Sequence, residues 1–174
     1  LSILALIPMQ SLAQDDPALD QYFVANAAYN RKLYPVAVTQ FQDFLQKHAN
    51  HPKADLARRG LGLSQYALKQ YEKAIPHFAT LLAKPSLDKS IDREHLIMLQ
   101  GQCMLHSTKK DEASQLFIAQ LGKLKKPTFR TAALAAICDI AFGKSEWEKV
   151  TEWTTKLMAS NPQPDQAARG LYQR

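Results

Sequence analysis

The sequence predicts an all-α protein in which antiparallel helix pairs stack into a solenoid. The first observation behind this prediction is a frame of small and aromatic residues that occurs four times in the 174 residues. The second is the near-constant period of the frame. Its equivalent residues Ala37, Ala74, Ala113 and Val150 are 37, 39 and 37 positions apart, a length typical of stacked helical repeats. The third is that each copy contains two stretches with the apolar period of a helix.

The frame places one small residue twelve positions before a second, with an aromatic residue four positions later. Its clearest copy is Gly62, Ala74 and Phe78. The other copies are Ala25, Ala37 and Phe41, then Gly101, Ala113 and Phe117, and finally the looser Cys138, Val150 and Thr154. We expect the small residues where paired helices cross, because a bulky side chain there would overpack the contact at a cost of about 1–3 kcal/mol. We expect the aromatic residue to fill the space beyond the crossing and to contact the adjacent unit.

The helix pairs are predicted in order along the chain. The first lies within residues 18–53, with apolar positions at Val24, Ala25, Ala28, Ala37, Val38, Phe41, Phe44 and Leu45. The second lies within residues 55–88, with Leu61, Gly62, Gln65 and Tyr66 in one helix and Ala74, Ile75, Phe78, Leu81 and Leu82 in the other. The third and fourth lie within residues 94–127 and 131–164, and residues 165–174 begin a truncated fifth repeat. In the fourth pair, FGKSEW predicts a turn in which Gly143 ends one helix and Ser145 caps the next.

Together these residues resemble the tetratricopeptide repeat (TPR) family, whose pattern is W-x₂-L-G-x₂-Y, then A-x₃-F and a proline. The second copy illustrates the resemblance, with Arg58, Leu61, Gly62, Gln65, Ala74, Phe78 and Pro85 at these positions. The segment YPVAVTQFQDFLQKHANHP is also similar to repeats of exported bacterial cell-envelope proteins of this family. The resemblance implies a right-handed superhelix. Its concave face would be lined by the first helix of each pair and would bind peptides or helices.

The resemblance also implies a set of candidate partner-binding residues on that face. They are Tyr22, Asn26, Tyr29, Asn30, Arg59, Leu63, Tyr66, Met98, Gln102, His106, Asp139 and Phe142. Tyrosine, arginine and methionine are favoured at interfaces; the alternative for each residue is ordinary half-exposed helix surface. One TPR subfamily holds a terminal carboxylate with a clamp of lysine, asparagine and arginine. The corresponding positions hold Tyr22, Asn26, Leu56, Gly60 and Arg59, so most of the clamp is absent and recognition of a terminal carboxylate is not predicted.

From these features we expect a non-catalytic scaffold that binds a peptide or helix of a partner protein. The sequence has no glycine-flanked serine, P-loop or dinucleotide-binding glycine pattern, so neither an enzyme nor a cofactor is predicted. His48 and His51 form a pair without the further ligands that a zinc site normally needs, so no metal is predicted. Two alternatives remain open: a targeting or regulatory arm of a longer enzyme, and a cell-wall or lipid-binding module that uses its basic charge.

The amino end of the chain predicts export. Residues 1–13 combine an apolar, uncharged run, LSILALIP, with a small and polar continuation. This is typical of a signal peptide remnant cut after Ala13, and the run is shorter than the roughly 20 apolar residues that span a bilayer. We therefore expect the periplasm or an equivalent envelope compartment of a bacterium. The alternative is a buried first helix, against which Pro8 and the abrupt change at Asp15 argue.

The net charge of +6 raises the question of nucleic acid binding. The densest basic stretch consists of Lys123, Lys125, Lys126 and Arg130. It is expected at a helix end and loop, where lysines are commonly solvated, and an exported protein rarely meets nucleic acid. Nucleic acid is therefore not predicted as a partner.

The two cysteines, Cys103 and Cys138, are expected to be small buried residues of packed helices. Helix axes pack roughly 8–10 Å apart, whereas a disulfide needs Cα atoms within about 7 Å. The alternative is a single disulfide, which an exported protein could form.

Overall fold

The computed structural model describes residues 16–173, which form helices and no strand. They form α1 (Pro17–Asn30), α2 (Tyr34–Lys47), α3 (Ala54–Ala67), α4 (Tyr71–Ala83), α5 (Arg93–Leu105), α6 (Lys110–Gln120), η1 (Leu121–Lys123, a 3-10 helix), α7 (Pro127–Gly143), α8 (Trp147–Ala159) and α9 (Pro164–Gln173). The all-α prediction is therefore confirmed. The segment predicted to be a signal peptide, residues 1–13, lies outside the described residues.

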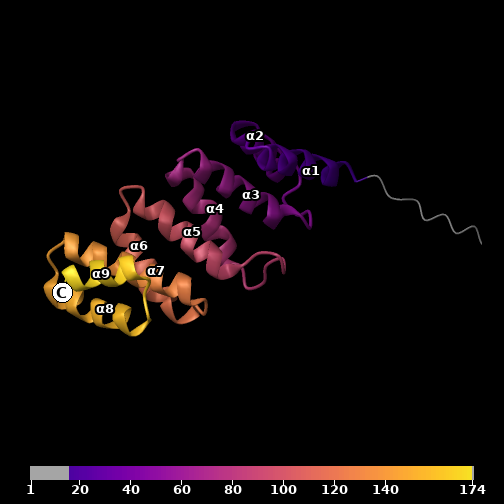
Figure 1. The fold of residues 1–174 in the computed structure, drawn as a ribbon. Coiled ribbons are helices and arrows are strands. Elements are labelled where there is room, and N and C mark those ends of the chain that lie inside the picture. The colour runs from indigo at the N-terminus through magenta and orange to yellow at the C-terminus, as the bar shows by residue number, and fades with distance from the viewer. Residues whose placement is uncertain (1–15, 174) are drawn as a thin grey trace, which may run out of the picture.

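The helices pack in the order in which they follow along the chain. Each α-helix contacts the next, and they form an elongated row from α1 at one end to α8 and α9 at the other (Figure 1). Some first helices also touch one another, since α1 contacts α3, α5 contacts α7 and α7 contacts α9. Each of the four predicted repeats corresponds to one helix pair, whose first helix begins one to four residues before the predicted start of the repeat. The result is a helical, repeat-like fold held together by contacts between neighbours.

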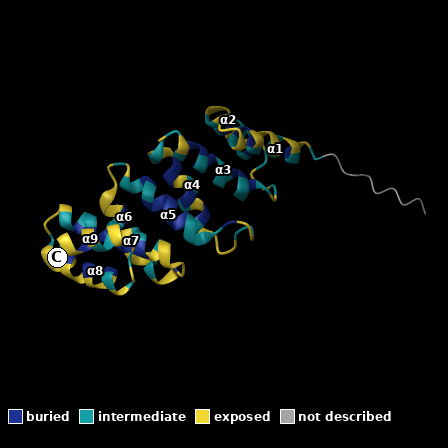
Figure 2. Cartoon of the chain, viewed as in Figure 1, coloured by how far each residue is buried: buried dark blue, intermediate teal, exposed yellow. Residues whose placement is uncertain are grey.

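The second helix of each of the first three pairs supplies a large buried aromatic side chain. Phe41 of α2, Phe78 of α4 and Phe117 of α6 are at most 1% exposed. The second small residue of every frame is also buried, at Ala37, Ala74, Ala113 and Val150. Buried residues face the gaps between helices, and the turns are largely exposed (Figure 2). The interior is shared between pairs, because Phe41 belongs to the same apolar cluster as Leu61 of α3.

Glycines of the first helices admit the phenylalanine of the same pair. A Cβ atom added at Gly62 would lie 2.8 Å from Cε1 of Phe78, and one added at Gly101 would lie 2.1 Å from Cζ of Phe117. Two antiparallel helices joined by a short turn bring residues sixteen positions apart to the same level. The sequence analysis placed the aromatic residue against the adjacent unit. That prediction was incomplete, because the ring also packs against the glycine of its own pair.

Phe41 makes the expected contact with the adjacent unit most directly. A Cβ atom added at Gly60 of α3 would lie 2.4 Å from Cζ of this ring. Gly60 therefore lets the third helix approach the second closely, which joins the first pair to the second.

Three turns within helix pairs share one backbone conformation. Lys32, Lys69 and Ser145 have φ angles of 61°, 59° and 58°. In each turn the next N–H group donates to a carbonyl five residues earlier; these bonds run from Leu33 to Ala28, from Gln70 to Gln65 and from Glu146 to Ala141, at 2.9, 2.8 and 3.0 Å. This pattern is the Schellman motif that ends helices.

The turn of the fourth pair differs from the expectation in one respect. Gly143 is the last residue of α7, as expected, but Ser145 does not cap α8. The N-cap residue is Glu146, which makes no side-chain capping bond. The prediction for Ser145 was wrong because this residue reverses the chain one position before the cap.

Both cysteines are buried and unpaired, as expected. Burial raises the pKa of the Cys103 thiol to about 12, and burial also raises the pKa of Cys138. The hydroxyl of Thr154 lies 3.9 Å from Sγ of Cys138, so the first and third residues of this frame face each other as well. The two thiols therefore act as small neutral packing groups.

Candidate functional site

Three of the predicted site residues lie on one face of α1, because positions 22, 26 and 29 follow the spacing of helix turns. Tyr22, Asn26 and Tyr29 are half-buried, and Asn30 is exposed at the end of the helix. The ring of Tyr22 packs against that of Phe41, with centroids 6.3 Å apart. Within residues 16–173, the hydroxyl groups of Tyr22 and Tyr29 form no hydrogen bond, in contrast to that of Tyr66. Their rings are thus anchored while their hydroxyl groups are unused within this part of the chain.

Arg59 of α3 acts electrostatically on both of these tyrosines. Burial raises the pKa of Tyr22 and of Tyr29, and the Arg59 guanidinium opposes both rises. Burial also lowers the pKa of His95 in α5, and Arg59 lowers it further. Arg59 is therefore within electrostatic reach of both α1 and α5. It is half-buried, and no ion pair within residues 16–173 includes it.

The middle of the predicted face joins α3 to α5. The hydroxyl of Tyr66 donates to Oε1 of Gln102 across 3.2 Å. The ring of Tyr71, at the start of α4, lies edge-on to Tyr66 at 5.5 Å and stacks on His106 at 4.9 Å. Leu63, also half-buried, packs against the apolar cluster under this part of the face. Tyr66 is thus brought together with Gln102 and His106, although it lies 36 positions before Gln102 in the sequence.

Tyr71 was not among the predicted site residues, although a sequence signal for it existed. An aromatic residue begins the second helix in three of the four pairs, at Tyr34, Tyr71 and Trp147. Each packs against an aromatic residue at the end of the preceding helix; the pairs are Tyr29–Tyr34, Tyr66–Tyr71 and Phe142–Trp147, with centroids 5.7, 5.5 and 5.7 Å apart. This repeated pair marks one end of the predicted face in each of these units.

Three further predicted residues have other surroundings. Met98 is only 5% exposed and belongs to the apolar cluster around Phe117, so its side chain fills the interior and we leave it out of the proposed surface. Asp139 accepts hydrogen bonds from Arg169 and Gln173 of α9, both at 2.8 Å. It therefore holds α9 against α7. Phe142 is half-buried and packs against Trp147.

A second arrangement that sequence reasoning missed fixes the start of α1. The carboxylate of Asp16 caps α1 by accepting the N–H groups of Ala18 and Leu19, both at 3.1 Å. Its other oxygen lies 3.0 Å from Nε2 of His51, in the loop before α3. Asp16 lies 35 positions before His51 in the sequence, so only the fold reveals this carboxylate partner. This contact helps to hold α1, with its tyrosines, beside α3.

In the part of the chain that the structure describes, no three His, Cys, Asp or Glu side chains lie close enough together to hold one metal ion. None of the helices within residues 16–173 has both the length and the apolar character needed to cross a bilayer. Comparison of the chain with models of known protein families and with curated proteins finds no match.

Proposed function

We propose that the protein is a non-catalytic scaffold, built as a TPR-like right-handed solenoid, that binds a peptide or helix of a partner protein. The binding face consists of the half-buried side chains of α1, α3 and α5. The observation that carries this proposal is the hydrogen bond between Tyr66 and Gln102, because it joins two predicted partner-binding residues from successive units into one surface. Side chains ordered in this way lose little conformational freedom when they bind.

Contacts between helices support the curvature that such a groove needs. Some first helices of neighbouring pairs touch, as α1 does with α3 and α5 with α7. No contact of similar extent joins α2, α4, α6 or α8 to one another within residues 16–173. In a curved stack the elements on the inner side approach one another more closely than those on the outer side. This favours the first helices as the concave lining.

We also propose that the protein works in a bacterial envelope compartment, on the strength of the signal-like residues 1–13. A cell-wall or lipid-binding role through the basic stretch has less support. The ammonium group of Lys126 is paired with Asp92, and that of Lys125 donates to the carbonyl of Gly122 at 3.1 Å. These lysines are thus partly engaged within the protein.

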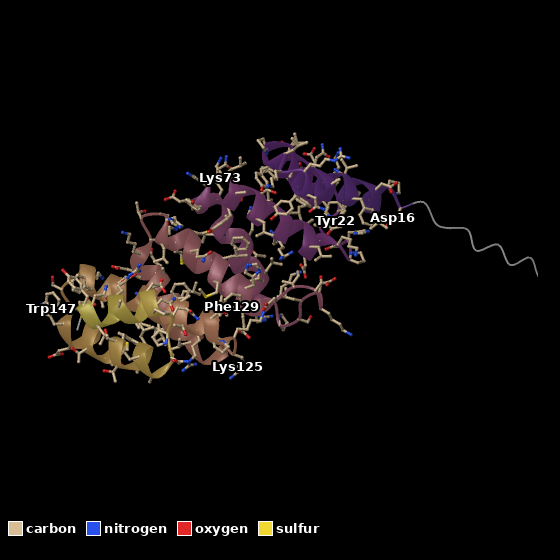
Figure 3. All side chains as sticks on the ribbon, viewed as in Figure 1. Asp16, Tyr22, Lys73, Lys125, Phe129 and Trp147 are labelled. Carbon is tan, nitrogen blue, oxygen red and sulfur yellow. The ribbon has the colours of Figure 1, made fainter. Side chains whose placement is uncertain are left out.

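Selection of short random peptides on the protein, followed by site-specific cross-linking, tests the binding face. A photoreactive benzoylphenylalanine replaces Leu63 on α3 or, as the control, the exposed Lys73 on α4 (Figure 3). We expect selected peptides to cross-link at position 63 and not at position 73. Cross-linking confined to position 73, or equal at both positions, would contradict the proposed face.

A further inference from the structure

We propose that two copies of the protein form a twofold dimer through the outer side of α1. The contact consists of Asp20, Val24, Ala27 and Arg31, which we call the α1 stripe. Their spacing follows the turns of a helix, so they lie along one side of it, and Arg31 directly follows the last turn. The inference goes beyond the proposed function and does not depend on it, because the predicted partner-binding residues of α1 lie on another side of the helix.

The α1 stripe is equivalent to the side of α3 that packs against the preceding unit. Residues of α1 and α3 that are 37 positions apart occupy the same place in their repeats. For the first three stripe residues, the equivalents in α3 are Ala57, Leu61 and Ser64. All three equivalents are buried, and two of them share an apolar cluster with Phe41 of α2. The stripe therefore lies where one unit of this fold normally contacts another.

The same side of α1 is exposed, because α1 forms one end of the row of helices (Figure 1). Val24 is 56% exposed, and the adjacent Phe23 is 53% exposed. Terminal units of a solenoid need a polar outer face to stay soluble, and neighbouring exposed apolar side chains mark contact sites. These two residues therefore favour a further protein surface over solvent as the covering of the stripe.

The charges of the stripe make it complementary to a second copy of itself. Asp20 and Arg31 are equally distant from one point of the helix, and Val24 and Ala27 are equally distant from the same point. When two α1 helices lie antiparallel about a twofold axis through this point, Asp20 of each copy is opposite Arg31 of the other. The larger Val24 is then opposite the smaller Ala27.

Neither charge of the stripe is offset within the protein. No ion pair within residues 16–173 includes Asp20 or Arg31, and both residues are exposed. A twofold contact would pair both of them twice, once in each half of the interface, and twofold dimers are the commonest protein oligomers. The contact involves mainly one helix of each copy and is thus small, so we expect a weak dimer with a dissociation constant of roughly micromolar order.

The test measures the mass of the 174-residue protein by analytical ultracentrifugation over a range of concentrations around that value. The charge-reversal variants are Asp20→Arg and Arg31→Asp, and Val24→Glu places a carboxylate in the middle of the stripe. Lys73→Asp reverses an exposed charge on α4 and is the matched control. A circular dichroism melt of each variant confirms that it folds.

We expect the mass of the original protein to rise from one copy to two as the concentration increases. Each charge reversal in the stripe should weaken the dimer at least about tenfold, because it replaces two opposite-charge pairs by two like-charge pairs. Val24→Glu should weaken it about a hundredfold, since it buries two unpaired carboxylates. Lys73→Asp should change the dissociation constant less than about twofold.

An equimolar mixture of Asp20→Arg and Arg31→Asp is the decisive sample. In the mixed pair, two arginines of one copy meet two aspartates of the other, so the dimer should return with an affinity close to that of the original protein. Because both changes lie at the same end of the row, a head-to-tail contact could not be restored in this way. Failure of the mixture to form the dimer would overturn the inference.

Other outcomes would also overturn it. They are a monomer at every concentration, a dimer that Lys73→Asp weakens as much as the stripe variants do, and a dimer that disappears when residues 1–13 are removed. A dimer that survives Val24→Glu but is lost in Leu171→Glu would belong to the opposite end of the row, where Leu171 is 59% exposed. Cross-linking of selected peptides at position 63 should persist in all stripe variants, so the proposed function is judged separately.

Discussion

Gly101 of α5 and Phe117 of α6 lie so close that a Cβ atom on the glycine would be 2.1 Å from Cζ of the ring. Both residues are buried, and Phe117 is fully enclosed. The absence of a side chain at position 101 thus decides how closely the two helices of the third pair approach. The same relationship joins Gly62 to Phe78 in the second pair.

Gly101→Ala should therefore destabilise the protein by about 1–3 kcal/mol, because relief of the overlap requires the buried ring or a helix to shift. This outcome opposes helix propensity, which favours alanine by up to about 1 kcal/mol. Gly143→Ala is the matched control, since a Cβ atom there would meet nothing within 4 Å at the end of α7. Urea denaturation measures both, and a stabilised Gly101→Ala variant would show that Phe117 yields without cost.

Replacement of Lys69 by glycine should stabilise the protein. The φ of 59° at this position lies in the left-handed region, which residues with a side chain disfavour. We expect Lys69→Gly to raise the free energy of unfolding by about 1 kcal/mol. Lys73→Gly, in the first turn of α4, should lower it by up to about 1 kcal/mol because this position is helical. Denaturation midpoints of the two variants should move in opposite directions, and a shift of both to lower denaturant would contradict the turn geometry.

Cys103 should be unreactive in the folded protein, since burial raises its pKa to about 12 and the thiolate is the reactive form. A thiol reagent at pH 8 should modify it only in denaturant. The neutral thiol is stabilised by folding, so its contribution is intact below the ordinary value of 9 and is lost as the pH rises from there toward about 12. Replacement by alanine should flatten the loss of stability above pH 9. Rapid modification of the folded protein at pH 8 would show that the site is open.

Asp16 should contribute to the attachment of α1, because it caps that helix and accepts a hydrogen bond from His51. Asp16→Ala should lower the melting temperature by a few degrees at neutral pH, and Asp20→Ala, an exposed residue of the same first turn, should lower it less. The hydrogen bond from His51 lowers the pKa of Asp16 most, and the bond from the Leu19 N–H group lowers it further. Its contribution is therefore present above the ordinary value of 3.8 and is lost as the pH falls below it. Equal effects of Asp16→Ala at pH 7 and pH 3 would contradict this assignment.

Much of the fold follows from local sequence. The spacing of apolar residues predicts helix pairs within residues 18–53, 55–88, 94–127 and 131–164, and the first helix of each pair begins within four residues of its predicted start. The candidate site was less accessible to sequence reasoning. Met98 was expected on the same partner-binding face as Gln102, yet it is buried in the cluster around Phe117. A periodic pattern identifies which residues share a side of a helix, but it does not reveal how deeply the next unit covers that side.

The sequence by itself determined the all-α class, the pairing of helices and the enclosure of Phe78 and Phe117, because short turns and helical periodicity act between residues close along the chain. Only the tertiary structure decided which polar groups meet. Tyr66 bonds to Gln102 and His51 to Asp16 across separations of 36 and 35 residues. The physical reason is that such contacts depend on the angle and distance between stacked units. These are set by many packed side chains together and not by any one stretch of residues.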